Sequence, residues 1–258
     1  MRRIMIMLVV LLLSATLSFA EDEKVVTQVS TVNAVMKGLY DGEMTFGELR
    51  NYGDFGLGYF DKLAGEVLAL DGVFYRIKGD GLTEIVKDND KTPFFTITTF
   101  ESKSDNFTNR NFDYNGLKEY LLTMMPRKKS FYAIKITGVF ENLKARTFLR
   151  QMKPYPDINH VLKTQTEFNF SNTEGILVGM FTPEFLEGVG IPGFHFHFLS
   201  ADKTRGGHVN SLKVKSITIE FIEIPLFQLR LPKDAKYQNA DLSITKSMKK
   251  ELQKFEKK

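Results

Sequence analysis

Short runs in which apolar and polar residues alternate dominate the chain and predict β-strands. Residues 213–224 (KVKSITIEFIEI) and 130–140 (SFYAIKITGVF) show this alternation most clearly. The stretch 143–152 is expected to continue the second of these strands after a bend at Gly138. Residues 92–100 (TPFFTITTF) form a β-branched and aromatic run that is equally typical of a strand.

Turn residues separate further apolar runs. Within residues 65–77 (GEVLALDGVFYRI), two runs meet at Asp71-Gly72, a dipeptide that favours a tight hairpin turn. Shorter strands are predicted between Gly and Pro residues, at 168–170, 175–181, 194–199 and 227–231.

Few segments have helical spacing. Apolar residues in 115–125 (NGLKEYLLTMM) recur on one helix face, a brief helical piece begins at Thr45, and residues 243–255 form a basic amphipathic helix. Many strands without βαβ alternation predict an α+β fold. We expect two β-rich halves with mixed or antiparallel sheets, few helices and a C-terminal helical tail.

The first twenty residues have the composition of a secretory signal peptide. Two arginines precede an apolar stretch at 4–13, and Ser18-Phe19-Ala20 is a small-x-small cleavage site. An uncleaved N-terminal anchor is the alternative. We therefore expect a bacterial protein that is exported to the periplasm or the medium and has no membrane association after cleavage.

The amino-acid composition limits the kinds of catalytic and binding site that the chain can form. The chain of 258 residues has no cysteine, which excludes a disulfide scaffold, a cysteine metal site and a cysteine nucleophile. Its formal net charge is +4, and removal of the leader with its two arginines lowers this to +2. A charge this small argues against a nucleic-acid partner. Histidines, carboxylates, hydroxyls or bound ions must therefore carry any chemistry.

Three of the four histidines lie close together in the sequence, at His195, His197 and His208. Residues two apart on a strand share a face, so His195 and His197 project together, while phenylalanines at 194, 196 and 198 fill the opposite face. His208 follows a glycine-rich turn and fits the next strand of a hairpin. Three converging imidazoles would leave coordination positions open for a catalytic metal.

The alternative is that these histidines lie on the polar face of an exposed hairpin. If they bind a metal, Zn²⁺ suits three neutral imidazoles best, with Fe, Co, Ni and Mn as alternatives. His160 lies in a predicted loop and is left out of the site. Asp202, between the ligands, is expected to be a turn residue.

Several long motifs resemble one enzyme family. The segment 182–209 (TPEFLEGVGIPGFHFHFLSADKTRGGHV) closely resembles α-acetolactate decarboxylases. The likeness continues through GDFGLGYFDKLAGEVLALDGVFYRI, KTPFFTITTF, KITGVFENLKARTFLRQMKPYP and GILVGMFTPEF, which cover nearly the whole chain after the leader. Two positions depart from the family pattern. Tyr59 replaces a small hydroxyl residue in a glycine-rich loop expected to face the substrate, and Ala64 replaces an aspartate.

The resemblance implies the site residues. His195, His197 and His208 match the family's zinc ligands, while Glu66 and Arg146 match its active-site glutamate and arginine. A second glutamate from the tail fits best at Glu256, although Glu251 lies nearer the centre of the predicted apolar face. Taken by themselves, Glu66 would be a solvated strand residue and Arg146 a structural ion-pair partner.

The predicted elements, together with the resemblance, give a domain organisation. A signal peptide at 1–20 would precede an N-terminal α+β domain at 21–137 and a β-rich metal-binding domain at 138–240, with a helical tail at 241–258 reaching the active site. The chain would form a homodimer.

The implied reaction is the metal-dependent decarboxylation of (S)-2-acetolactate, a 2-hydroxy-3-keto acid, to (R)-acetoin and CO₂ in acetoin and butanediol biosynthesis. Two alternatives stay open. A cupin-like metalloenzyme shares the PG…HxH pattern but needs a glutamate that residues 198–202 lack. An exported metal-binding or DNA-binding module is the second alternative, and the small net charge argues against DNA.

Overall fold

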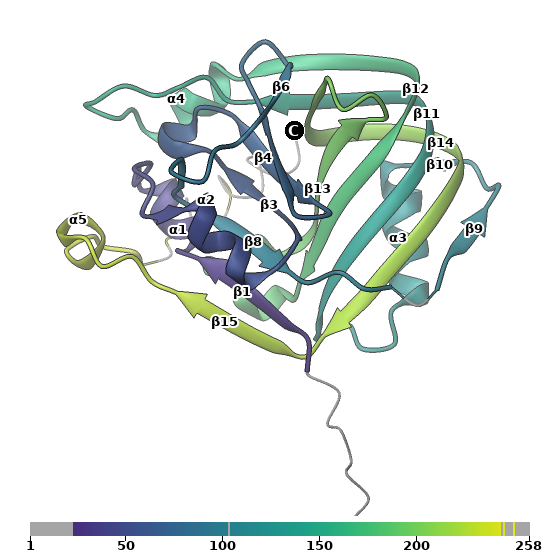
Figure 1. The fold of residues 1–258 in the computed structure, drawn as a ribbon, viewed down its shortest axis with the longest axis horizontal. Helices are drawn as coiled ribbons and strands as arrows, with labels where there is room; N and C mark the ends of the chain where they lie inside the picture. Colours follow the sequence, from purple (N-terminus) through teal and green to yellow (C-terminus); the bar gives the residue numbers. More distant parts are fainter. Residues whose placement is uncertain (1–22, 103, 244, 246–249, 251–258) are drawn as a thin grey trace, which may run out of the picture.

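Two β-sheets form the framework of the computed structural model, which describes residues 23–102, 104–243, 245 and 250. In Figure 1 the purple and blue strands of the first sheet lie on the left, and the long teal, green and yellow strands of the second sheet lie on the right. The predicted α+β class is confirmed. The predicted leader and the tail helix, apart from residues 243, 245 and 250, lie outside the described residues.

The first sheet has seven strands, antiparallel except for one pair. Its order is β15 (Leu226–Arg230), β1 (Val25–Val29), β8 (Phe95–Thr98), β3 (Phe55–Tyr59), β4 (Glu66–Leu70), β5 (Val73–Ile77) and β6 (Thr83–Ile85). The predicted hairpin at Asp71-Gly72 joins β4 to β5, and both residues have positive φ angles, as a tight hairpin turn requires. Strand β15 lies parallel to β1, so the end of the chain completes a sheet built mainly from its first third.

The second sheet is antiparallel and contains the three longest strands. Its order is β10 (Phe112–Asp113), β14 (Gly206–Ile224), β11 (Phe131–Thr147), β12 (Thr166–Thr182) and β13 (Gly193–Ser200), with β9 (Asn106–Thr108) also paired to β14. The first residues of β14 also pair with β13. Because β13 pairs with both β12 and β14, strands β11 to β14 form a closed ring of paired strands at the end of the sheet where β14 begins.

Three sequence expectations about these strands need correction. The segments 168–170 and 175–181 belong to one strand, β12, which pairs with β11 across the glycines and polar residues expected to interrupt it. Strand β11 ends at Thr147, short of the predicted continuation to residue 152. The bend was expected at Gly138. The irregularities in the register between β11 and β14 lie further along the strand, between residues 139 and 145.

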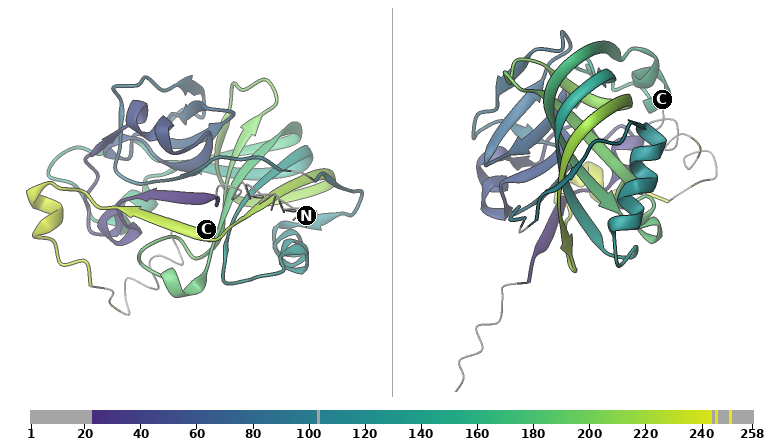
Figure 2. Two further views of the ribbon diagram at one scale, coloured as in Figure 1. Left: turned by 60° about the horizontal axis from the view of Figure 1, so that its bottom comes forward. Right: turned by 90° about the vertical axis from the view of Figure 1, so that its right-hand side faces the viewer.

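Short helices cover the sheets. They are α1 (Val32–Met36), α2 (Phe46–Leu49), α3 (Tyr114–Met124), α4 (Ile158–Lys163) and α5 (Ala235–Gln238), with single 3₁₀ turns at Arg50–Tyr52, Asp61–Leu63 and Glu184–Leu186; Met44–Thr45 (β2) pairs with Lys91–Thr92 (β7) in a separate ribbon. The predicted helix at 115–125 is α3 within one residue at each end, and it lies along the outer face of the second sheet (Figure 2). In the part of the chain that the structure describes, no helix has the length and hydropathy needed to cross a bilayer.

Two apolar cores hold the second sheet in place. Its outer face packs with α3 through residues such as Leu117, Leu121 and Phe196. Its inner face packs against the first sheet, where Val178, Met180 and Leu199 meet Leu57 and Leu68. The predicted domain boundary at residues 137 and 138 falls inside β11, and the division into two domains stays a prediction.

Glycines on β12 make room for the phenylalanines of β13. A Cβ at Gly179 would lie 2.2 Å from the ring of Phe196, and one at Gly175 would lie 2.3 Å from the ring of Phe198. Because Phe196 and Phe198 flank His197 in β13, these glycines allow β13 to lie close to its neighbour.

We expect Gly179→Ala to destabilise the protein by about 1–3 kcal/mol, because the added methyl group overpacks a closed core. Urea unfolding of the variant measures this loss. Gly116→Ala in α3, where the nearest atom to the new Cβ is the exposed Asp113 carboxylate oxygen at 3.3 Å, is the comparison and should be destabilised less than Gly179→Ala. Equal stability of Gly179→Ala and wild type would contradict the packing described here.

Candidate active site

Successive side chains of β13 point to opposite faces of the sheet, as the sequence predicts. His195 and His197 point to one face and are 3% and 0% exposed. Phe196 and Phe198 belong to the core on the opposite face, against α3. The alternative, in which the histidines lie on the polar face of an exposed hairpin, is excluded because the imidazoles are enclosed within the fold.

Strand β14 brings the third histidine alongside. His208 is the register partner of His197 on one side and of Arg146 on the other, so three residues form one row across β13, β14 and β11. The Nε2 atom of His195 lies 3.1 Å from Nε2 of His197 and 3.0 Å from Nδ1 of His208. The histidine cluster is therefore assembled by strand pairing.

The protonation state of the cluster follows from its surroundings. Nδ1 of His197 lies 2.9 Å from the carbonyl oxygen of Val67, which can only accept, so Nδ1 carries the proton and Nε2 presents a lone pair. Burial lowers the pKa of His197 to about 3, although this hydrogen bond opposes the change. Burial, reinforced by His197 and Arg146, also holds the pKa of His195 well below its usual value. Both rings are neutral at pH 7.

This donor set fits a metal ion. Three ligand atoms, one from each histidine, lie within 4.8 Å of one another, and all three residues are buried. A proton on Nε2 of His195 can be donated to only one of the two neighbouring imidazole nitrogens. A cation between the rings can bind the lone pairs of all three nitrogens. Neutral imidazoles are the form in which histidine binds metals. The cluster can therefore hold a metal ion.

A buried ion pair lies directly beside the histidines. Glu66 begins β4 in the first sheet, and its Oε1 accepts a hydrogen bond of 2.8 Å from Nη1 of Arg146 in the second sheet. Its Oε2 lies 3.3 Å from Nε2 of His197. The side chains of Arg146 and Glu66 are 1% and 0% exposed. Glu66 and Arg146 thus lie together next to the histidines, and their catalytic roles stay predictions.

The remaining sequence predictions have different outcomes. Glu256 and its alternative Glu251 lie outside the described residues. Asp202 is a turn residue, because its carboxylate accepts hydrogen bonds from Ser200 and Thr204. His160, in α4, is exposed and does not belong to the histidine cluster.

Comparison with known proteins gives the family. The family model described as "Alpha-acetolactate decarboxylase" matches residues 26–244. The chain belongs to the α-acetolactate decarboxylase family.

Relatives and a solved structure agree with this assignment. The chain is 38% identical over 233 residues to the α-acetolactate decarboxylase of Methanosarcina mazei, covering 90% of this chain and 80% of the relative. It is also 38% identical over 221 residues to that of Brevibacillus brevis, covering 86% and 78%. The crystal structure of the Bacillus subtilis strain 168 enzyme matches with a TM-score of 0.88 and 34% identity, covering 91% of this chain and all of that one. Family membership decides against the cupin-like alternative and the binding-module alternative.

One departure from the family pattern has a different setting from the one predicted. Tyr59 is the last residue of β3, not part of a loop, and it is fully buried as the register partner of Glu66. Its ring packs against Phe94 and Phe148 at centroid distances of 5.9 and 6.0 Å.

Phe148 is a site residue that sequence reasoning missed. The guanidinium carbon of Arg146 lies 4.5 Å from the centre of its ring. The alternation that places residues 146 and 148 on one face was the available signal, and it is indistinguishable from ordinary core packing. Tyr59 therefore packs against the ring that lies next to the guanidinium of Arg146.

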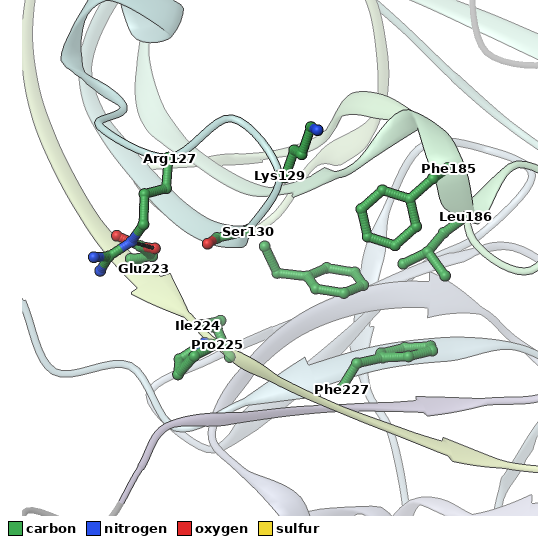
Figure 3. Close-up of a pocket in the computed structure, with 10 residues that line it drawn as sticks. Arg127, Lys129, Ser130, Phe185, Leu186, Glu223, Ile224, Pro225 and Phe227 are labelled. Carbon is green, nitrogen blue, oxygen red and sulfur yellow. Dashed lines mark hydrogen bonds and ion pairs between the residues drawn. The ribbon is translucent and has the colours of Figure 1, made fainter.

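Two surface cavities lie away from the histidines. A cavity of about 360 Å³ at the junction of β14 and β15 is lined by Phe185, Leu186 and Phe227, with Arg127 paired to Glu223 at its edge (Figure 3). A second, of about 1080 Å³, is lined by Phe181 and Phe194, on the face of the second sheet opposite His195. Neither cavity includes a histidine of the cluster, Glu66 or Arg146.

The lowered histidine pKa values predict acid sensitivity of the metal-free protein. The pKa of His197 is about 3 in the fold and about 6.5 in an unfolded chain. The unfolded state therefore binds protons first, and stability that is fully present above about pH 6.5 is lost as the pH falls toward the folded pKa. For His195 and His197 together, we expect a loss of up to about 2.7 kcal/mol per pH unit, about 1.36 for each proton bound.

Urea unfolding of metal-free protein between pH 7 and pH 5 measures this slope. His197→Asn should flatten it, whereas His160→Asn, at an exposed position, should not change it. A His197→Asn variant with the wild-type slope would show that this imidazole is not held neutral by the fold.

Proposed function

We propose that this chain catalyses the decarboxylation of (S)-2-acetolactate to (R)-acetoin and CO₂ with one Zn²⁺ ion held by His195, His197 and His208. The observation that carries the proposal is the buried three-histidine cluster beside the Glu66–Arg146 pair, in a chain of this family. When bound, zinc supplies a Lewis acid that withdraws electron density from the hydroxyl and ketone oxygens of the substrate.

Arg146 has the chemistry to orient the substrate carboxylate. Its guanidinium is planar and carries five N–H donors, and Nη1 donates a hydrogen bond to Glu66. The ring of Phe148 lies against the guanidinium and limits its rotation. A carboxylate bound in a bidentate manner by a guanidinium is held in one orientation. The carbon–carbon bond whose cleavage releases CO₂ then breaks in a fixed geometry.

Glu66 is suited to move the proton that completes the reaction: its carboxylate, ionised in the pair with Arg146, takes the proton of the substrate hydroxyl and later returns it to carbon, and water supplies the proton that restores the hydroxyl. Loss of CO₂ leaves an electron pair on the carbon that carried it, delocalised onto the neighbouring carbonyl oxygen as an enediolate. Protonation of that carbon gives acetoin, and the face that receives the proton fixes the configuration. The Oε2 atom of Glu66 faces the histidine cluster, so Glu66 can donate from one side only.

Export and self-association complete the proposal. The leader at 1–20 supports secretion to the periplasm or the medium. The homodimer follows from family resemblance, and size-exclusion chromatography with light scattering measures it.

Metal removal tests the reaction. Purified protein should release CO₂ and acetoin from racemic 2-acetolactate, lose this activity on dialysis against a chelator, and regain it with one equivalent of Zn²⁺. His208→Ala should lower both the bound zinc and the turnover by at least about tenfold, because one of three ligands is lost. Metal-replete protein that produces no acetoin would overturn the proposed function.

Glu66→Gln tests the proton donor. We expect kcat to fall by about 10²-fold or more, because an amide cannot deliver the proton, while zinc content stays at the wild-type level. Glu167→Gln, a partly exposed glutamate of β12 paired with Lys144, is the control and should retain full activity. Unchanged kcat and unchanged enantiomeric excess in Glu66→Gln would assign the proton to another group.

A further inference from the structure

A buried hydroxyl joins the two sheets at the active site. Thr147 ends β11 in the second sheet and is fully buried. Its Oγ1 accepts a hydrogen bond of 3.2 Å from the backbone N–H of Glu66 and donates one of 2.9 Å to the carbonyl oxygen of Ile77. Glu66 and Ile77 are register partners in β4 and β5. The hydroxyl thus links the end of β11 to a paired position in the first sheet.

Glu66 is consequently held at two points by two consecutive residues. Thr147 bonds its backbone nitrogen, and Arg146 bonds Oε1 of its carboxylate at 2.8 Å. The two contacts fix both ends of the glutamate relative to β11. Because Arg146 is also the register partner of His208, the same strand sets the position of Glu66 relative to the histidine cluster.

We propose that Thr147 is a positioning residue, whose hydroxyl fixes the backbone of Glu66 so that the carboxylate presents Oε2 to one face of the reacting carbon. This inference rests on the proposed function, in which Glu66 delivers the proton. Without the Thr147 hydroxyl, β4 loses its backbone hydrogen bond to β11 at Glu66, and the start of β4 can move relative to β11. Movement of that kind changes the direction from which the proton arrives, and small displacements of a catalytic group lower the rate steeply.

The chemistry of the hydroxyl accounts for a threonine or serine at this position. The partners are one donor, the Glu66 N–H, and one acceptor, the Ile77 carbonyl, and a hydroxyl can serve both at once. Valine has nearly the same shape but can serve neither, and alanine removes the hydroxyl with less crowding. Serine keeps the hydroxyl. These three substitutions separate hydrogen bonding from packing.

Zinc-loaded Thr147→Val should show a kcat about tenfold lower and a reduced enantiomeric excess of acetoin. The KM and the zinc content should stay within about twofold of wild type, because Arg146 and the histidines are untouched. Thr147→Ser should recover most of both losses. Thr137→Val, at an exposed position of the same strand, is the matched control for the substitution itself.

A double-mutant cycle with Glu66→Gln separates positioning from general loosening of the fold. If Thr147 acts through Glu66, adding Thr147→Val to Glu66→Gln lowers kcat no further. Should Thr147→Val fail to fold, Thr147→Ala takes its place in the same measurements. Wild-type kcat and enantiomeric excess in the valine or alanine variant, equal impairment of the serine variant, or additive losses in the cycle would overturn the proposal. Absence of acetoin production by wild type would instead overturn the proposed function.

Discussion

The pairing of one residue from each of three strands organises the site. His197, His208 and Arg146 face each other across β13, β14 and β11 because the hairpin of β13 and β14 closes against β11. Partners in antiparallel strands are separated by about 5 Å, and their side chains share a face. Backbone hydrogen bonds therefore hold two candidate ligands and a guanidinium in one row.

This row depends on an irregularity in the strands. Ala145 pairs with Val209 and Lys144 pairs with Ser211, so Asn210 has no register partner in β11. A shift of one residue in register reverses the face of every following side chain. Because of this extra residue, His208 faces the first sheet, while the apolar residues further along β14 face α3.

The sequence correctly predicted those features of the site that depend on the alternation of side chains within a single strand. Alternation alone separated His195 and His197 from Phe196, and the glycine-rich turn placed His208 on the returning strand. Bulges and pairings between distant segments leave no comparable pattern. The partnership of Arg146 with His208 was therefore not predictable from spacing, and neither was the bond from Thr147 to the backbone of Glu66. The addition of β15 to the first sheet was missed for the same reason, because it pairs segments at opposite ends of the described chain.

The parallel pairing of β1 with β15 has a consequence for the order of folding. Val25 pairs with Leu226, so nearly the whole described chain lies between two adjacent strands. During synthesis β1 emerges early and can pair on one side with β8, but its other edge stays open until β15 has been made. Contacts between residues this distant in sequence slow folding and prolong the exposure of unpaired strand edges. Completion of the first sheet is thus among the last events of folding, and a chain truncated before residue 226 would leave β1 as an open edge.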